Sequence, residues 1–180
     1  MVKSRTFVWT LAGIAFALAL FVVIVPLFRT QPSSTNGPAG LAGGIAPVFV
    51  LHDDSGAAVS LTHYRGNVVV MNLWASWCPP CRAEMPDLQR LADAYRGRNL
   101  AIVGVNEGET VERARAFAGA LKIAFPIWMD DQQRYGRAYG ALGLPTTVIV
   151  GSDGTVLRGF DGALSYAQMR AAVAPLVETR

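Results

Sequence analysis

The sequence feature that most limits the fold is a pair of cysteines between an apolar run and an amphipathic segment. The run VVVMNLWA (68–75) is nearly continuous in apolar residues, as in a strand that is buried on both faces. Cys78 and Cys81 follow this run. After them, apolar side chains recur every three or four positions for about 16 residues, which predicts a helix; they are Met85, Leu88, Leu91, Ala92 and Tyr95. Both cysteines therefore belong to the turn where a buried strand passes into a helix.

Together with this strand and helix, further segments of the sequence predict an α/β fold with a mixed central sheet flanked by helices. Residues 99–106 predict a second buried strand, and a strand, a helix and a strand in such a short stretch form a parallel βαβ unit. A turn signal, Ser152-Asp153-Gly154, predicts a hairpin between two later strands. The other predicted elements are strands at 146–150 and 155–160 and helices at 110–122, at 132–141 and after a capping box formed by Ser165 and Gln168.

Cys78 and Cys81 are three positions apart, so they can close a small disulfide ring at the first turn of a helix. The amides and the dipole of the helix N-terminus stabilise a thiolate, which lowers the pKa of Cys78 from about 8.5. We therefore expect Cys78 to attack a substrate disulfide, and Cys81, more buried and one turn inside the helix, to resolve the mixed disulfide. Zinc is not expected, because His52 and His63 are the only other strong ligands and have no ligand spacing.

Pro79 and Pro80 separate the two cysteines and act against this stabilisation. Proline is favourable in the first helical turn, but it has no amide hydrogen to donate to the Cys78 sulfur. A less stabilised reduced form makes the disulfide a weaker oxidant. The two prolines therefore favour a reductant.

The N-terminal part of the sequence contains a stretch of 22 uncharged residues at 7–28. As a helix with a rise of about 1.5 Å per residue it would reach roughly 33 Å, enough to cross a hydrocarbon core of about 30 Å. We expect residues 1–29 to be an uncleaved membrane anchor, residues 30–45 a flexible linker, and residues 46–180 the folded domain. The alternative is a cleaved signal peptide, for which Gly40-Leu41-Ala42 is the best cleavage site.

The charge distribution argues against nucleic-acid binding and predicts the orientation of the anchor. Lys3, Arg5 and Arg29 are the only charged residues among the first 30, and the other 150 residues hold 13 basic and 13 acidic side chains. The basic balance of the chain therefore belongs to its N-terminus and not to a nucleic-acid-binding face. By the positive-inside rule, a single span would leave residues 30–180 outside the cytoplasmic membrane.

Three segments resemble a known family: VVVMNLWASWCPPCRAEMPDL (68–88), VNEGE (105–109) and GLPTT (143–147). They are similar to the thioredoxin superfamily, and most of all to its membrane-anchored extracytoplasmic branch, the ResA/TlpA/CcmG (DsbE) group. The resemblance covers residues 46–178 and implies a thioredoxin-like fold there. Thr146 favours the ResA/TlpA side, because CcmG proteins usually carry glutamate at this position.

The resemblance also implies roles for residues in the GLPTT segment. Pro145 would be a cis-proline that packs beside Cys78. A cis bond would turn the backbone of Leu144 outward, where Leu144 and its neighbour Thr146 would contact an extended client segment. The alternative for Pro145 is a structural proline in a loop or at a strand edge.

Three further residues near the cysteines bear on proton transfer or on client binding. ResA-like proteins carry a functional glutamate at the position of Glu84; the alternative is a glutamate that favours the helix dipole on a solvated face. Asn72 occupies the position where thioredoxin has a buried acid, so another group must handle the proton of Cys81. Trp77 would form part of an exposed apolar patch for client docking, with simple packing as its alternative.

The resemblance implies a thiol-disulfide oxidoreductase that reduces disulfides in client proteins, with apocytochromes c among the clients. No cofactor is implied, and a membrane dithiol donor would reduce the protein again, because the sequence has no nicotinamide motif. Three alternatives remain: an oxidant of secreted proteins, a non-catalytic binding module and a thiol peroxidase. The intact cysteine pair argues against a binding module, and the missing P-x-x-x-[ST]-x-x-C motif argues against a peroxidase.

Overall fold

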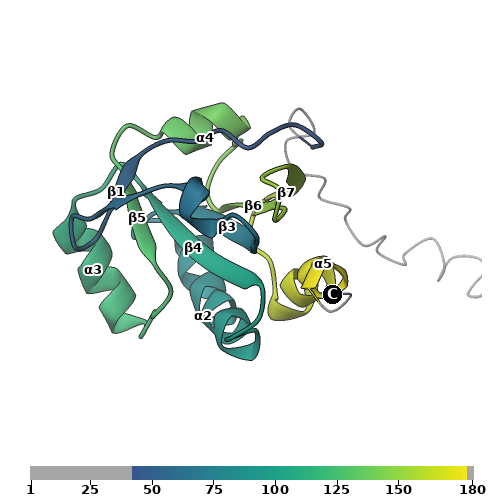
Figure 1. The fold of residues 1–180 in the computed structure, drawn as a ribbon. Helices are drawn as coiled ribbons and strands as arrows, with labels where there is room; N and C mark the ends of the chain where they lie inside the picture. The colour runs from purple at the N-terminus through teal and green to yellow at the C-terminus, as the bar shows by residue number, and fades with distance from the viewer. Residues whose placement is uncertain (1–41, 178–180) are drawn as a thin grey trace, which may run out of the picture. The chain divides into compact units, whose positions relative to one another are not determined.

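The computed structural model describes residues 42–177 of the 180-residue chain (Figure 1). The predicted anchor at 1–29 and most of the predicted linker lie outside the described residues. Between residues 42 and 177, no helix combines the length and the apolar character needed to cross a membrane. The elements in chain order are β1 (Leu51–Asp53), β2 (Ala58–Val59), the 3-10 helix η1 (Leu61–Tyr64), β3 (Val68–Trp74), α2 (Pro79–Ala94), β4 (Leu100–Glu107), α3 (Val111–Ala120), β5 (Ile127–Asp130), α4 (Arg134–Tyr139), β6 (Thr146–Val150), β7 (Val156–Asp161) and α5 (Tyr166–Val177).

The strands form one seven-stranded sheet in the order β2-β1-β5-β4-β3-β6-β7. Strands β3, β4 and β5 are parallel to one another, whereas β6 is antiparallel to β3, β7 to β6, and β1 to both β5 and β2. The predicted mixed sheet and the parallel β3-α2-β4 unit are thus confirmed. Since β3 lies between β4 and β6, the cysteine motif begins at the carboxyl end of an inner strand of the sheet.

Helices cover both faces of this sheet, as predicted, and the alternation of side chains along β3 shows how (Figure 1). Val70 and Trp74 belong to an apolar cluster that includes α2, α3 and α5, whereas Met71 and Leu73 belong to a second cluster that includes α4 and η1. All seven residues of β3 are buried. Asn72 shares the face of Val70 and Trp74, so its side chain points toward α2.

The capping predictions are confirmed, and the ends of two helices differ from the predicted ones. Thr110 Oγ1 accepts a hydrogen bond from the Arg113 amide at 3.4 Å and caps α3. Helices α3 and α4 are each shorter than predicted, because Lys122 (φ 55°) and Gln133 (φ 53°) have left-handed backbone conformations that a right-handed helix cannot include. The capping box of α5 forms as expected, with Ser165 and Gln168 exchanging hydrogen bonds.

Strands β1, β2 and β5 were not predicted from the sequence. They contain three, two and four residues, which is too short for a reliable alternation pattern. Strand β2 pairs with the nearby β1, where Ala58 lies opposite His52, whereas the pairing of β1 with β5 joins distant segments: His52 in β1 lies opposite Met129 in β5. The pairing of β5 with β1 and β4 joins segments that are distant in the chain, which no local pattern reveals.

Candidate active site

Cys78 and Cys81 form a disulfide at the N-terminus of α2, with their Cα atoms 5.3 Å apart. Cys78 is the N-cap residue, and its Sγ accepts a hydrogen bond from the Cys81 amide at 3.2 Å. This contact confirms that the helix N-terminus directs an amide at the first sulfur. The expectation that Cys78 is accessible is wrong for this disulfide form, because only 2 % of the residue is exposed, whereas Cys81 is buried as expected, with 1 % exposed. The asymmetry between them therefore rests on the helix end.

Pro79 and Pro80 occupy the first two positions of α2. An N-cap side chain normally accepts a hydrogen bond from the second or third amide of the helix. Because proline has no amide hydrogen, the Cys81 amide is the only one of the first three that can donate to the Cys78 sulfur. A Cys78 thiolate thus receives less stabilisation here than at a helix start without prolines.

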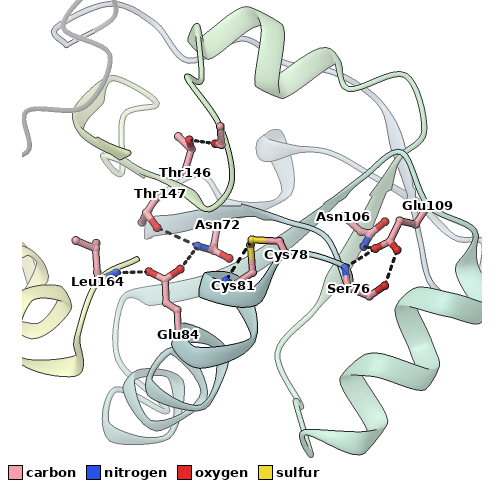
Figure 2. The surroundings of a disulfide bond; sticks show 11 residues. Asn72, Ser76, Cys78, Cys81, Glu84, Asn106, Glu109, Thr146, Thr147 and Leu164 are labelled. Carbon is pink, nitrogen blue, oxygen red and sulfur yellow. Dashed lines mark hydrogen bonds between the residues drawn. A yellow bond between two sulfur atoms is a disulfide. The ribbon is translucent and has the colours of Figure 1, made fainter. Parts of the chain in front are cut away.

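Glu84 lies one turn after Cys81 on α2 and is buried in a polar cluster beside the disulfide (Figure 2). The side chain of Asn72 donates a hydrogen bond to Glu84 Oε2 at 3.1 Å, and the amide of Leu164 donates one to Oε1 at 2.9 Å. Burial raises the pKa of Glu84 from an ordinary value near 4.5 to about 7, although the two hydrogen bonds oppose this shift. Glu84 can therefore take up or release a proton near neutral pH.

Asn72 holds this carboxyl group in place. Its Nδ2 also donates a hydrogen bond to Thr147 Oγ1 at 3.0 Å, so Asn72 connects α2 to β6. The sequence interpretation treated Asn72 only as a missing acid and did not recognise it as a partner of Glu84, although its place in the alternation of β3 could have shown that it faces α2. The solvated-face alternative for Glu84 is wrong, because only 2 % of the residue is exposed.

A second polar cluster holds the loop before Cys78 (Figure 2). Glu109 accepts hydrogen bonds from the amide of Ser76 at 2.6 Å, from the Ser76 hydroxyl at 2.5 Å and from the side chain of Asn106 at 2.8 Å. Burial raises the pKa of Glu109, but these hydrogen bonds outweigh burial and leave the pKa below its ordinary value. Glu109 therefore remains ionised and fixes the approach to the motif, a role that the sequence interpretation did not assign.

The predicted GLPTT segment has the expected cis peptide bond between Leu144 and Pro145. Leu144 is partly buried, whereas Thr146 is buried at the start of β6. The Thr146 hydroxyl lies 2.7 Å from the Gly143 carbonyl oxygen and 2.8 Å from Asp161 Oδ1. Thr146 thus anchors this loop through its side chain, and that side chain is not presented at the surface.

Trp77 is 64 % exposed next to Cys78, which agrees with its predicted place in an exposed apolar patch. Trp74, in contrast, is fully buried and stacks on Phe117. Trp77 and Leu144 both line a hollow of about 320 Å³. The structure therefore brings these two predicted client-binding residues to one surface depression.

The histidines contribute nothing to this site in the described part of the chain. His52 and His63 are both exposed. Across residues 42–177, no group of three or more His, Cys, Asp or Glu side chains could hold a metal ion.

The chain is similar to several known proteins. The profile of the AhpC/TSA family matches residues 42–158. A thiol-disulfide oxidoreductase ResA from Geobacillus thermodenitrificans is 37 % identical over 136 residues, which cover 76 % of this chain and 78 % of that one. The ResA of Bacillus subtilis is 31 % identical over 168 residues, which cover 93 % and 90 %.

The fold agrees with this relationship. A solved structure of a thiol:disulfide interchange protein of the thioredoxin family from Chlorobium tepidum superposes with a TM-score of 0.66 at 25 % identity, covering 73 % of this chain and 94 % of that one. Profile, relatives and fold agree, so the chain belongs to the AhpC/TSA family of thioredoxin-like proteins, together with the ResA-type thiol-disulfide oxidoreductases.

Proposed function

We propose that this protein is a membrane-anchored protein-disulfide reductase that works outside the cytoplasm. The observation that carries the proposal is the Cys78–Cys81 pair at the N-terminus of α2, beside the buried Glu84 with a pKa of about 7. This arrangement supplies a nucleophile, a resolving thiol and a group that can accept a proton. The relatives named thiol-disulfide oxidoreductase support the same class of reaction.

The first step begins from the reduced protein, in which the Cys78 thiolate attacks one sulfur of a client disulfide. A bond forms between Cys78 Sγ and that sulfur, the client disulfide breaks, and the other client sulfur leaves as a thiolate that takes a proton from water. The amide of Cys81 supports the Cys78 thiolate before the attack, as it contacts the same sulfur in the disulfide form.

In the second step Cys81 loses its proton and attacks Cys78 Sγ. Glu84 follows Cys81 by three residues on the same helix and takes this proton, directly or through water. The Cys78–Cys81 disulfide forms and the remaining client sulfur leaves as a thiolate, so two electrons have passed to the client. A membrane dithiol donor returns two electrons to the protein.

Clients bind across the hollow that Trp77 and Leu144 line. Trp77 offers apolar contact, and the backbone of Leu144 beside the cis-proline Pro145 pairs with an extended client segment. Thr146 positions this loop through its bond to Asp161. The resemblance to the ResA/TlpA/CcmG group supports apocytochromes c as one class of client in this proposal, since their C-x-x-C-H cysteines must be reduced before haem attaches.

The location and the direction of this reaction can be tested together in cells that express the full chain. We expect the protein in the membrane fraction, with residues 45–180 digested by protease added outside the cytoplasmic membrane. Trapping the thiols with an alkylating reagent should show Cys78 and Cys81 mostly reduced, because the donor keeps a reductase in its dithiol form.

A cytoplasmic protein of the same cells serves as the control and should resist the protease. A processed soluble form that begins near Gly43 would contradict the anchor. A cysteine pair found mainly as the disulfide would contradict the reductase direction and favour an oxidant.

A further inference from the structure

The hollow beside the disulfide contains an acidic group that the proposed reaction does not use. Trp77 and Leu144 line the hollow on the side of the cysteine motif and the cis-proline loop, and Glu107, Gly136 and Arg137 line it from β4 and α4. Glu107 is only 4 % exposed, whereas Trp77 is 64 % exposed. A carboxyl group thus forms part of the wall of the depression in which a client would lie.

The burial of Glu107 follows from its place at the end of β4. Val103, Val105 and Glu107 alternate along the strand, and the two valines belong to the apolar cluster on the α4 face of the sheet. The carboxyl group lies close to Gly136 at the start of α4: a Cβ atom added to Gly136 would come within 3.0 Å of Glu107 Oε2. The absence of a side chain at Gly136 leaves room for the carboxyl group at this wall.

Glu107 is only partly satisfied in the described structure, because the Gly136 amide donates a hydrogen bond to its carboxyl group but one oxygen has no partner. Its Oε1 atom is buried and has no hydrogen-bond partner among the described residues. Burial and the neighbouring Asp130, which lies opposite Glu107 in the β4–β5 pairing, raise the pKa of Glu107 to about 7. A buried carboxyl group without a full set of partners is costly, and a cation or a hydrogen-bond donor that enters the hollow would reduce this cost.

We propose that this hollow is a subsite for a basic side chain, lysine or arginine, next to the client cysteine that Cys78 attacks. The inference rests on the proposed reductase function and adds a preference among clients. Two features of the hollow suit a cation: the buried carboxyl group of Glu107 in its wall and the exposed indole of Trp77, whose face attracts a positive charge. Glu107 would then be a specificity-determining residue.

Other charged groups near Glu107 affect how strongly its carboxyl group would bind a client cation. Asp130 is fully buried and has an ion pair with Arg134 at 3.7 Å, so its negative charge is already partly compensated. Arg137 is exposed at the same hollow and lowers the pKa of Glu107, but forms no ion pair with it among the described residues. Arg137 therefore competes with a client cation for the carboxylate without occupying it.

The test uses three short peptides, each with one disulfide, that differ only in a lysine, a glutamine or a glutamate beside the first cysteine. The reduced full-length protein is mixed with each peptide at pH 8, where most of Glu107 is ionised, and kcat/KM is measured with dithiothreitol as the electron source. Each value is divided by the rate with dithiothreitol alone, so that the intrinsic reactivity of the peptide cancels. We expect the lysine peptide to react about 10-fold faster than the glutamine peptide, and the glutamate peptide to be slowest.

Glu107→Gln keeps the shape of the side chain and should bring the lysine-to-glutamine ratio close to one. The control is Glu112→Gln, which removes the same charge from the exposed first turn of α3 and should retain the preference. Arg137→Gln should increase the preference, because it removes the competing cation, and this variant remains informative if Glu107→Gln does not fold.

The outcomes separate this inference from the proposed function. A wild-type protein that reduces all three peptides at equal normalised rates is a reductase without this subsite, which overturns the inference alone. A protein that reduces none of them contradicts the proposed function. A preference for lysine that Glu107→Gln leaves unchanged, or that Arg137→Gln lowers, would also overturn the assignment of Glu107.

Discussion

Replacing Cys81 by serine is expected to stop the reaction halfway and to leave the protein joined to its client. Cys78 can still attack, but no thiol remains to resolve the mixed disulfide, so release of the reduced client should fall by at least about 10²-fold. Cys78→Ser should form no mixed disulfide, because no thiol then remains at the helix N-terminus, where the amide of Cys81 would stabilise its thiolate. Non-reducing electrophoresis followed by mass spectrometry checks both results.

Both cysteines are almost completely buried in the disulfide form, so the two variants differ in the position of the remaining thiol and not in its exposure. If burial decided reactivity, the two variants would trap clients to the same extent. Equal trapping would therefore refute the assignment of Cys78 as the nucleophile, which rests on its N-cap position.

Glu84→Gln is expected to slow thiol exchange on the order of 10²-fold, the usual contribution of a positioned acid or base. Glutamine keeps the size of the side chain and can still accept the hydrogen bond from the Leu164 amide, but it cannot take the proton of Cys81. Loss of the nearby negative charge should also lower the pKa of at least one active-site thiol. Single-turnover exchange rates and alkylation rates measured against pH check these two effects separately.

A control variant exists on the same helix. Asp93→Asn removes an exposed carboxylate nine residues further along α2, where Asp93 forms an ion pair with Arg96. It should leave the alkylation profile near that of the unchanged protein. Identical alkylation profiles and identical exchange rates for Glu84→Gln would remove Glu84 from the mechanism.

The raised pKa of Glu84 also has a consequence for stability, with a definite sign. The folded protein holds a proton on Glu84 up to pH 7, whereas the unfolded chain releases it near pH 4.5. The free energy of unfolding should therefore fall as the pH rises from about 4.5 to 7, by up to roughly 3 kcal/mol for this group. Glu84→Gln should flatten this dependence, and Glu107, whose pKa is raised in the same way, accounts for part of what remains.

The central part of the fold could be predicted from local sequence patterns. The buried run of β3, the helical spacing after Cys81 and the turn at Ser152-Asp153-Gly154 each determine an element by themselves, and the structure confirms them. Strand β5 could not be found in this way, because its four residues are held by pairing with β4 and β1. Such pairing depends on residues far apart in the chain.

The site could be predicted only in part, because a sequence does not state which carboxyl groups are buried. Glu84, Glu107 and Glu109 all lie near the motif, yet burial raises the pKa of the first two and hydrogen bonds lower that of the third. Glu109 depends on Ser76, which is 33 positions away in the chain. Glu107 could have been recognised, since it continues the alternation of Val103 and Val105 on the buried face of β4.

The equilibrium of the Cys78–Cys81 pair with a glutathione buffer tests the central claim most directly. Pro79 and Pro80 leave one amide donor for the Cys78 sulfur, and Glu84 places a carboxyl group nearby, so the thiolate is weakly stabilised. We therefore predict a reduction potential nearer to about −270 mV, the value of thioredoxin, than to about −120 mV, the value of a strong oxidant. A potential near −120 mV would contradict the assignment of this protein as a reductase.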